Sequence, residues 1–332
     1  MGDTPCSVSA DRTGLAGVDA VMRFSEMFII TKAHRGTDQT LFTVLIILAL
    51  CFLLTQKSEA KLTKDQEGRT VSVPDNPQRV VSLAPSITEI VFALGEGDRL
   101  KGVTQHCDFP ADAQLLPKVG SYVNLDLERI VALKPDLCIA VRDGNPRNIV
   151  VELEALGIPV YAVDPRNLDT VVDTVLEVGQ LLNATTKAQH LANEMRARIE
   201  RVKVRVAGTG RRPRVFFQIG TAPIVSAGTN TVINELIVAA GGQNLAEGPA
   251  SYPLFSREQV LALQPEVIII TAMTKEPDLE QVGAEWRQYE GLPAVRNNRI
   301  FIVDGDLFDR PTPRLIKGLE TLAGIIHPEL FR

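Results

Sequence analysis

Residues 128–137 (ERIVALKPDL) and residues 258–267 (EQVLALQPEV) are two versions of one segment. In each, an apolar stretch with helical spacing runs into a proline, then an acidic residue, then the start of a β-branched run. This order predicts a helix, a tight turn and a buried strand. The same supersecondary unit is therefore expected twice in the chain.

Two further pairs of segments match in the same order. Residues 79–81 (RVV) correspond to residues 214–216 (RVF), and residues 89–95 (EIVFALG) correspond to residues 235–241 (ELIVAAG). Three matches in one order indicate two copies of a single structural unit.

Each copy alternates short β-branched runs with helical stretches. In the first copy, residues 79–83, 136–140 and 159–163 are predicted strands, and residues 86–94 are a predicted helix that ends at Gly95. Alternation of this kind predicts α/β lobes, in which parallel sheets are covered by helices on both faces.

The segment between the two copies predicts one long helix. Residues 167–206 contain no proline and only one glycine, Gly179, and their apolar residues recur at helical spacing. A helix of about 35 to 40 residues would extend about 55 Å. Such a connection leaves a cleft between the lobes, which is a preferred place for a ligand.

The chain is therefore predicted to have four parts. They are an N-terminal extension with a secretory signal (1–60), an N-terminal α/β lobe (61–165), a linking helix (166–207) and a C-terminal α/β lobe (208–332).

The N-terminal part carries the features of an export signal. Residues 41–54 (LFTVLIILALCFLL) form an uncharged run that is apolar apart from Thr43, and it is shorter than the roughly 20 residues that a membrane-spanning helix needs. Basic residues precede this run, and the small residues Ser58 and Ala60 follow it. This layout predicts a Sec-type signal, a mature chain that begins at Lys61, and a periplasmic or other extracytoplasmic location. The alternative is an uncleaved N-terminal anchor.

Composition and motifs argue against several classes of function. The 332 residues include 40 acidic and 35 basic side chains, a net charge of −5, so a nucleic acid partner is not expected. The sequence lacks the G-x-S-x-G, H-E-x-x-H and G-x-x-x-x-G-K-[ST] motifs, and predicts no catalytic residue, resident metal or cofactor. A disulfide between Cys107 and Cys138 is left open.

Four motifs resemble the periplasmic cobalamin-binding proteins, which belong to the iron-siderophore and cobalamin class of ABC-importer binding proteins. The motifs are RVVSLAPSITEIVFALG (79–95), CDFPADA (107–113), LPKVGSYVNLDLERIVALKPDL (116–137) and SREQVLALQPEVI (256–268). The resemblance covers about residues 74–332 and implies two α/β lobes joined by a long helix. It also implies capture of cobalamin or a related corrinoid, as cargo, for a permease dimer with its ATPase subunits. Contact with a membrane is expected only through that permease or an uncleaved anchor.

The resemblance also implies ligand-binding positions. Tyr122 and Tyr252, one from each lobe, are expected against the corrin ring. His106, Val141 and Arg142 are expected at further pocket positions, and Asp306 and Arg310 are expected to make polar contacts. His106 and Val141 stand where the cobalamin-binding relatives carry aromatic residues. A corrin, a broad apolar ring fringed with amides, suits aromatic walls with a few fixed polar groups.

Other interpretations of these residues remain open. The tyrosines could be ordinary surface residues, and Arg310 could form a surface ion pair with Asp309 or Asp306. His106 could ligate corrinoid cobalt on one axial face or donate to a corrin amide. A haem or ferric-siderophore carrier is the alternative function, with Tyr122 or His106 as an iron ligand.

Glu128 and Glu258 occupy the same position in the two copies, at the start of the repeated helix. A carboxylate in the first turn of a helix is favoured by the helix dipole, which is a sufficient structural reason for both. The resemblance implies a further role, in which each glutamate meets an arginine on one of the two permease subunits.

Overall fold

The protein is described by a computed structural model that covers residues 60–271 and 279–331. The apolar run 41–54 lies outside the described residues, so the predicted signal is not part of this structure. The chain from Ser58 onward forms one compact unit. Within the described ranges, no helix is both long enough and apolar enough to cross a membrane.

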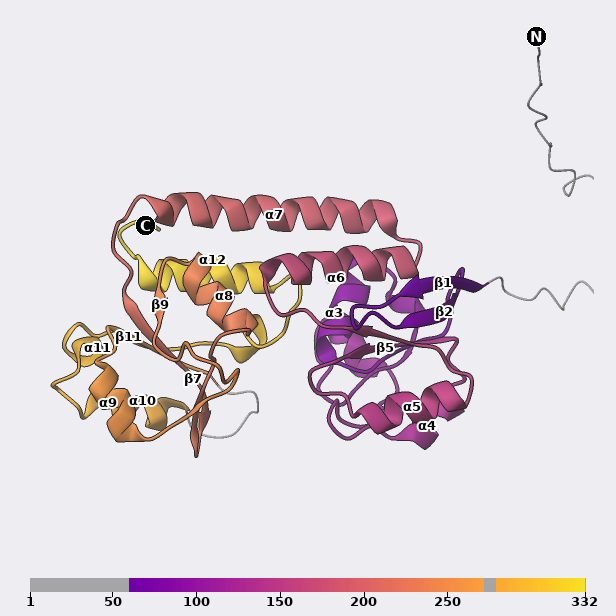
Figure 1. Cartoon of the computed structure of the whole chain (residues 1–332), viewed down its shortest axis with the longest axis horizontal. Helices are drawn as coiled ribbons and strands as arrows, with labels where there is room; N and C mark the ends of the chain where they lie inside the picture. Colours follow the sequence, from indigo (N-terminus) through magenta and orange to yellow (C-terminus); the bar gives the residue numbers. More distant parts are fainter. Residues whose placement is uncertain (1–59, 272–278, 332) are drawn as a thin grey trace, which may run out of the picture. The chain divides into compact units, whose positions relative to one another are not determined.

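The first lobe contains an antiparallel hairpin, β1–β2, and a four-stranded parallel sheet with the order β4-β3-β5-β6 (Figure 1). Gly95, with φ +70°, follows the first helix and ends it, as predicted. The elements are β1 (Ala60–Lys64), β2 (Thr70–Pro74), β3 (Val80–Ser82), α3 (Pro85–Ala93), η1 (Gly97–Arg99), β4 (Leu100–Gly102), η2 (Ala111–Leu115), α4 (Leu127–Ala132), β5 (Leu137–Val141), α5 (Arg147–Ala155) and β6 (Val160–Val163).

The second lobe repeats this order and adds an antiparallel pair. Strands β9, β7, β11 and β12 are parallel neighbours in the order that β4, β3, β5 and β6 have in the first lobe, and β8 and β10 extend the sheet beyond β7. The elements are β7 (Arg214–Thr221), β8 (Ile224–Ser226), α8 (Val232–Ala239), β9 (Gln243–Asn244), β10 (Leu254–Phe255), α9 (Arg257–Leu263), β11 (Val267–Ile270), α10 (Leu279–Arg287), α11 (Pro293–Arg296), β12 (Ile300–Ile302), η3 (Gly305–Leu307) and α12 (Leu315–Ile326).

Strand register confirms the sequence repeat. Val80 lies opposite Leu137 in the first sheet, and the matching Val215 lies opposite Val267 in the second. The turns before β5 and β11 are also the same, because each contains one residue with a positive φ, at 48° for Lys134 and at 47° for Gln264. The prediction of two similar α/β lobes is therefore correct.

The linking segment differs from the single helix predicted over residues 167–206. It forms α6 (Leu168–Leu181) and α7 (Thr185–Ala207), which pack side by side, so the long linking helix is the 23-residue α7 (Figure 1). Asn183, with φ 57°, lies in the turn between them. Periodicity missed this turn because the apolar spacing continues through it, and asparagine adopts the left-handed region more readily than most residues.

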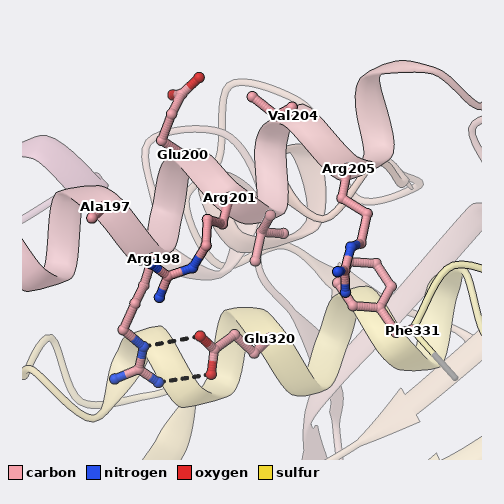
Figure 2. Close-up of a pocket in the computed structure, with 9 residues that line it drawn as sticks. Ala197, Arg198, Glu200, Arg201, Val204, Arg205, Glu320 and Phe331 are labelled. Carbon is pink, nitrogen blue, oxygen red and sulfur yellow. Dashed lines mark hydrogen bonds and ion pairs between the residues drawn. The ribbon is translucent and has the colours of Figure 1, made fainter.

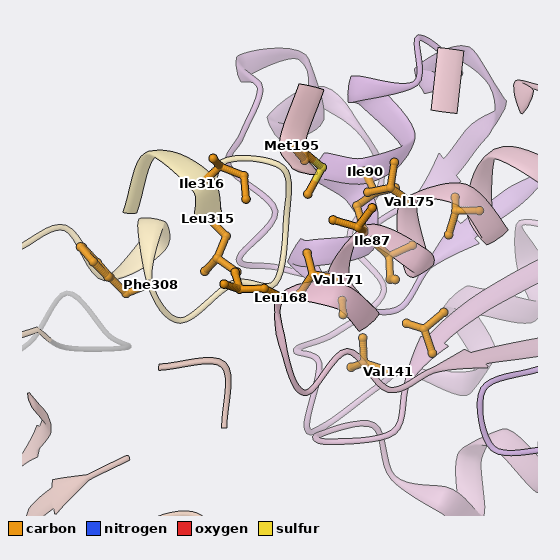
Figure 3. Packing of buried hydrophobic residues seen from close by; sticks show 14 of the residues in the cluster. Ile87, Ile90, Val141, Leu168, Val171, Val175, Met195, Phe308, Leu315 and Ile316 are labelled. Atoms are coloured by element: carbon orange, nitrogen blue, oxygen red, sulfur yellow. The ribbon is translucent and has the colours of Figure 1, made fainter. Parts of the chain in front are cut away.

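Two local cores and one shared core hold the unit together. One cluster lies wholly within the first lobe and a second wholly within the second lobe. The third contains residues of both lobes and of α6 and α7; Ile87 of α3, Val171 of α6, Met195 of α7 and Leu315 of α12 belong to it (Figure 3). The lobes and their connection are therefore joined through packed apolar side chains.

Candidate functional site

Several of the predicted ligand-binding residues lie in segments that follow parallel strands. Arg142 follows β5, and Asp306 and Arg310 lie beyond β12, while Tyr252 precedes β10. The carboxyl ends of parallel strands are where open α/β sheets bind ligands. Topology thus gathers residues that are far apart in the sequence.

Tyr122 is held by two residues that follow β5. The buried Asn145 donates from Nδ2 to the carbonyl oxygens of Tyr122 (2.7 Å) and Leu83 (2.8 Å), and its Oδ1 accepts from the backbone nitrogen of Val141 (2.8 Å). Gly144, with φ +126°, lies under the ring, because a Cβ there would be 2.5 Å from Tyr122 Cε2. The loop after β5 therefore fixes the position of the tyrosine.

Tyr252 connects the second lobe to the first. Its hydroxyl donates to Asp143 Oδ2 at 3.4 Å, and its side chain is half exposed. Burial and the Asp143 carboxylate raise the pKa of Tyr252 to about 12. Arg166, which follows β6, is bonded to Asp164 and lies near enough to interact electrostatically with both Asp143 and Tyr252; these contacts raise its pKa.

The charge of Asp309 acts on both tyrosines. Burial first, then the carboxylates of Asp143 and Asp309, raises the pKa of Tyr122 and of Tyr252. Both carboxylate oxygens are shielded from solvent and accept no hydrogen bond from the described chain. Burial first, then Asp306, raises the pKa of Asp309 to about 7, while Arg310 acts in the opposite direction.

Arg310 is the centre of an ionic network that joins the lobes. Its guanidinium contacts Asp306 (2.8 Å), Asp108 (2.8 Å) and Glu89 of α3 (3.1 Å). Glu89, with 2% of its side chain exposed, also accepts from Arg314 at 2.6 and 2.7 Å. Of the two ion pairs considered for Arg310, the one with Asp306 is present.

The remaining predicted residues take different environments. The His106 side chain is exposed, and its carbonyl oxygen accepts from Arg310 at 3.3 Å. Val141 is buried in the shared core. Arg142 is exposed and pairs with Asp164 (2.8 Å) and Glu67 (3.2 Å). Their contact with a ligand stays a prediction.

Both cysteines considered for a disulfide are buried free thiols. Cys107 Sγ lies 3.1 Å from the hydroxyl oxygens of Thr88 and Thr104, and burial raises its pKa. Cys138 lies within β5, and burial raises its pKa to about 12.

Glu128 and Glu258 are exposed at the second positions of α4 and α9. Each helix is capped by the residue two before the glutamate: Asp126 accepts from Arg129 N, and Ser256 accepts from Gln259 N. The N-cap hydrogen bonds are therefore made by Asp126 and Ser256. Both glutamates are exposed to solvent, and hydrogen bonds from its own backbone N–H and from Ser256 lower the pKa of Glu258.

Sequence reasoning missed five residues that organise this site: Glu89, Asp143, Asn145, Arg166 and Asp309. Asp143 and Asn145 could have been found, because they directly follow a predicted buried strand of a parallel sheet. The contacts of Glu89 with Arg310 and Arg314 join residues more than 200 positions apart, which no local pattern encodes.

A separate hollow of about 760 Å³ lies beside α7 (Figure 2). Arg198 of α7 donates to both carboxylate oxygens of Glu320 of α12, at 2.9 and 2.7 Å, and Arg205 lies over the Phe331 ring, 5.0 Å from its centroid. No residue of the predicted ligand site lines this hollow.

Two curated relatives are both named vitamin B12-binding protein. The chain is 35% identical over 243 residues to a vitamin B12-binding protein of Vibrio parahaemolyticus, covering 73% of this chain and 86% of that protein. It is 33% identical over 246 residues to a vitamin B12-binding protein of Yersinia pestis, covering 74% and 85% of the two chains.

Solved structures give the same fold. The periplasmic vitamin B12-binding protein BtuF of Vibrio cholerae matches with a TM-score of 0.69 and 31% identity, over 77% of this chain and 98% of that one. The periplasmic heme-binding protein RhuT of Roseiflexus sp. RS-1 matches with a TM-score of 0.68 and 29% identity, over 76% and 98%. The family model for periplasmic binding proteins matches residues 80–307. The chain therefore belongs to the periplasmic binding protein family.

Proposed function

We propose that this protein captures cobalamin or a related corrinoid between its two lobes and delivers it to an ABC importer. The observation that carries the proposal is the pair Tyr122 and Tyr252, one from each lobe. The loop after β5 contacts both, because Tyr252 donates to Asp143 and Gly144 lies under the Tyr122 ring. Two aromatic walls with polar groups beside them suit a broad apolar ring fringed with amides. The similarity to vitamin B12-binding proteins over most of their length supports the same ligand.

The protein acts, in this proposal, as a carrier without catalysis. It is exported by the signal predicted in residues 1–60 and works outside the cytoplasm, where it presents its cargo to a permease dimer driven by ATPase subunits. Glu128 and Glu258 are the proposed docking residues, because both are exposed at equivalent positions of the repeated helices. His106 is proposed to contact the corrinoid, either by donating to a corrin amide or by ligating cobalt on one axial face.

A haem carrier is the second candidate, because a heme-binding protein of 29% identity shares the fold. Titration of the purified protein with cyanocobalamin and with hemin, followed by absorption spectroscopy, separates the two. We expect saturable corrinoid binding that Tyr122→Ala and Tyr252→Ala each weaken by about tenfold, since loss of one stacked aromatic costs on the order of 1 kcal/mol or more. Binding of hemin alone would reject the corrinoid proposal.

A further inference from the structure

The second half of α7 and the segment that follows it concentrate positive charge. Eight of the nine charged residues between positions 196 and 214 are basic, and Glu200 is the ninth, although the whole chain has a net charge of −5. The helix dipole favours a cation in the last turn, such as Arg205, but it gives no reason for the cations that precede that turn. A concentration of this kind favours an anionic partner.

Several of these cations have no carboxylate partner within the described part of the chain. Arg201, Lys203, Arg205 and Arg212 are all exposed, and none of them forms an ion pair with a described residue, whereas their neighbours do. Arg205 instead lies over the Phe331 ring, 5.0 Å from its centroid. Positive charge is therefore left at the surface for a partner outside this chain.

The cations lie on both sides of an apolar line along α7. Ala197 and Val204 are seven residues apart, so they lie on the same side of the helix, and both are exposed, Val204 to 65%. Arg201 and Arg205 lie beside this line, at the hollow next to α12 (Figure 2). Lys203 lies on the other flank, because helical residues two positions apart point in nearly opposite directions. Apolar side chains between cations on an exposed helix are typical of a helix that lies at the surface of an anionic membrane.

This side of α7 is separate from the residues proposed for the ligand and the permease. Helix α7 lies along one edge of the two lobes, and α4 and α9, which carry the proposed docking glutamates, lie at the opposite edge (Figure 1). No residue of the predicted ligand site lines the hollow beside α7. A partner on α7 therefore leaves the ligand site and the docking glutamates free.

We propose that the outward side of α7, together with the segment up to residue 212, binds the surface of an anionic phospholipid membrane. Lipid phosphates pair with the cations on both flanks of α7, and Val204 packs against the upper part of the acyl chains. A flat partner is favoured over an acidic protein segment, because the cations lie on both flanks of one exposed helix rather than within a single groove. This contact is a third route to a membrane, besides the permease and an N-terminal anchor, and it does not rest on the proposed function.

Sedimentation with lipid vesicles tests the proposal. The exported form, predicted to begin at Lys61, is used because it lacks the apolar run 41–54. At low ionic strength we expect binding to vesicles of equal parts phosphatidylglycerol and phosphatidylcholine, and no binding to vesicles of phosphatidylcholine alone. Salt at about 1 M, where the Debye length is about 3 Å, should release the protein.

Arg201→Glu with Lys203→Glu reverses two of the unpaired cations. Each basic residue near an anionic surface contributes about fivefold in affinity, so this double variant should bind the anionic vesicles about 25-fold more weakly or worse. Arg147→Glu with Arg296→Glu is the matched control, because it makes the same change in charge at exposed positions of α5 and α11, away from α7 (Figure 1). The control should bind the vesicles like the wild type, and both double variants should keep their affinity for cyanocobalamin.

Three results would overturn the proposal. They are absence of wild-type binding to the anionic vesicles, an equal loss of binding with both double variants, and binding of soluble poly-glutamate without binding of the vesicles. The last result would assign this side of α7 to an acidic protein segment instead. The affinity for cyanocobalamin is measured separately, so none of these results bears on the proposed carrier function.

Discussion

At the scale of single residues, the site depends on side chains that do not themselves have to touch the ligand. Asn145 ties the Tyr122 loop to the strands beneath it, and Gly144 leaves space for the Tyr122 ring. Both residues directly follow β5. Gly144 and Asn145, which follow β5, therefore set the position of Tyr122.

Asn145→Ala should lower both stability and ligand affinity. The substitution removes three hydrogen bonds and leaves two carbonyl oxygens and one N–H without their partner, so the free energy of unfolding should fall by about 1–3 kcal/mol. Urea denaturation and cyanocobalamin titration measure the two effects. Asn148→Ala, at an exposed position of α5, is the control and should change neither. An Asn145→Ala protein with wild-type stability would show that the three Asn145 hydrogen bonds do not stabilise the fold.

At the scale of elements, the connection between the lobes is a helical pair. The turn between α6 and α7 brings Gly179 against Ala188, where an added Cβ would lie 2.2 Å from the Ala188 Cβ. Helix α7 therefore packs back on α6, and the glycine that interrupts an otherwise good helical sequence is required by this close approach.

Gly179→Ala should destabilise the protein, although alanine favours a helix over glycine by about 1 kcal/mol. The clash with Ala188 must push the two helices apart, and overpacking of this kind costs about 1–3 kcal/mol. Thermal or urea unfolding measures the change. Gly208→Ala, where no atom lies within 4 Å of the added Cβ, should be nearly neutral. Restored stability in Gly179→Ala with Ala188→Gly would confirm the cause, and a neutral Gly179→Ala would contradict it.

The elements also show what the sequence could and could not predict. The repeat between residues 128–137 and 258–267 predicts two lobes correctly, because period and turn chemistry are local properties. The break at Asn183 and the network around Arg310 were not predictable in this way. The first depends on packing between two helices, and the second joins α3 to a segment beyond β12 that only the folded chain brings close.

At the scale of the whole molecule, the shared core and the Glu89 network limit how far the lobes can move independently. Independent movement of the lobes would require the packed side chains of α3, α6, α7 and α12 to separate. It would also require the ion pairs of the nearly buried Glu89 to break. Breaking a buried ion pair by removing one partner costs about 3–5 kcal/mol. The pseudo-repeat also places one exposed glutamate on each lobe, Glu128 and Glu258, at the same helical position.

Reversal of these two charges should separate docking from ligand binding. Glu128→Arg with Glu258→Arg should abolish stimulation of the reconstituted importer while changing cyanocobalamin affinity less than twofold, because charge pairs at an interface rim set encounter and orientation. Single reversals should have partial effects, and added salt should weaken the wild-type complex.

The control for this prediction carries the same change in charge elsewhere. Glu152→Arg with Glu200→Arg alters two exposed positions, on α5 and α7, and should leave importer stimulation intact. Normal uptake with the docking double variant, or an equal loss of stimulation with the control, would refute the docking role.

A direct competition between two ligands tests whether this protein is a corrinoid carrier. The purified protein is equilibrated with equimolar cyanocobalamin and hemin, separated from free ligand by gel filtration, and examined by absorption spectroscopy. We expect the corrinoid spectrum at a stoichiometry of about one per chain, consistent with a dissociation constant of about 1 µM or tighter. A haem spectrum, or protein that leaves the column without either chromophore, would contradict it.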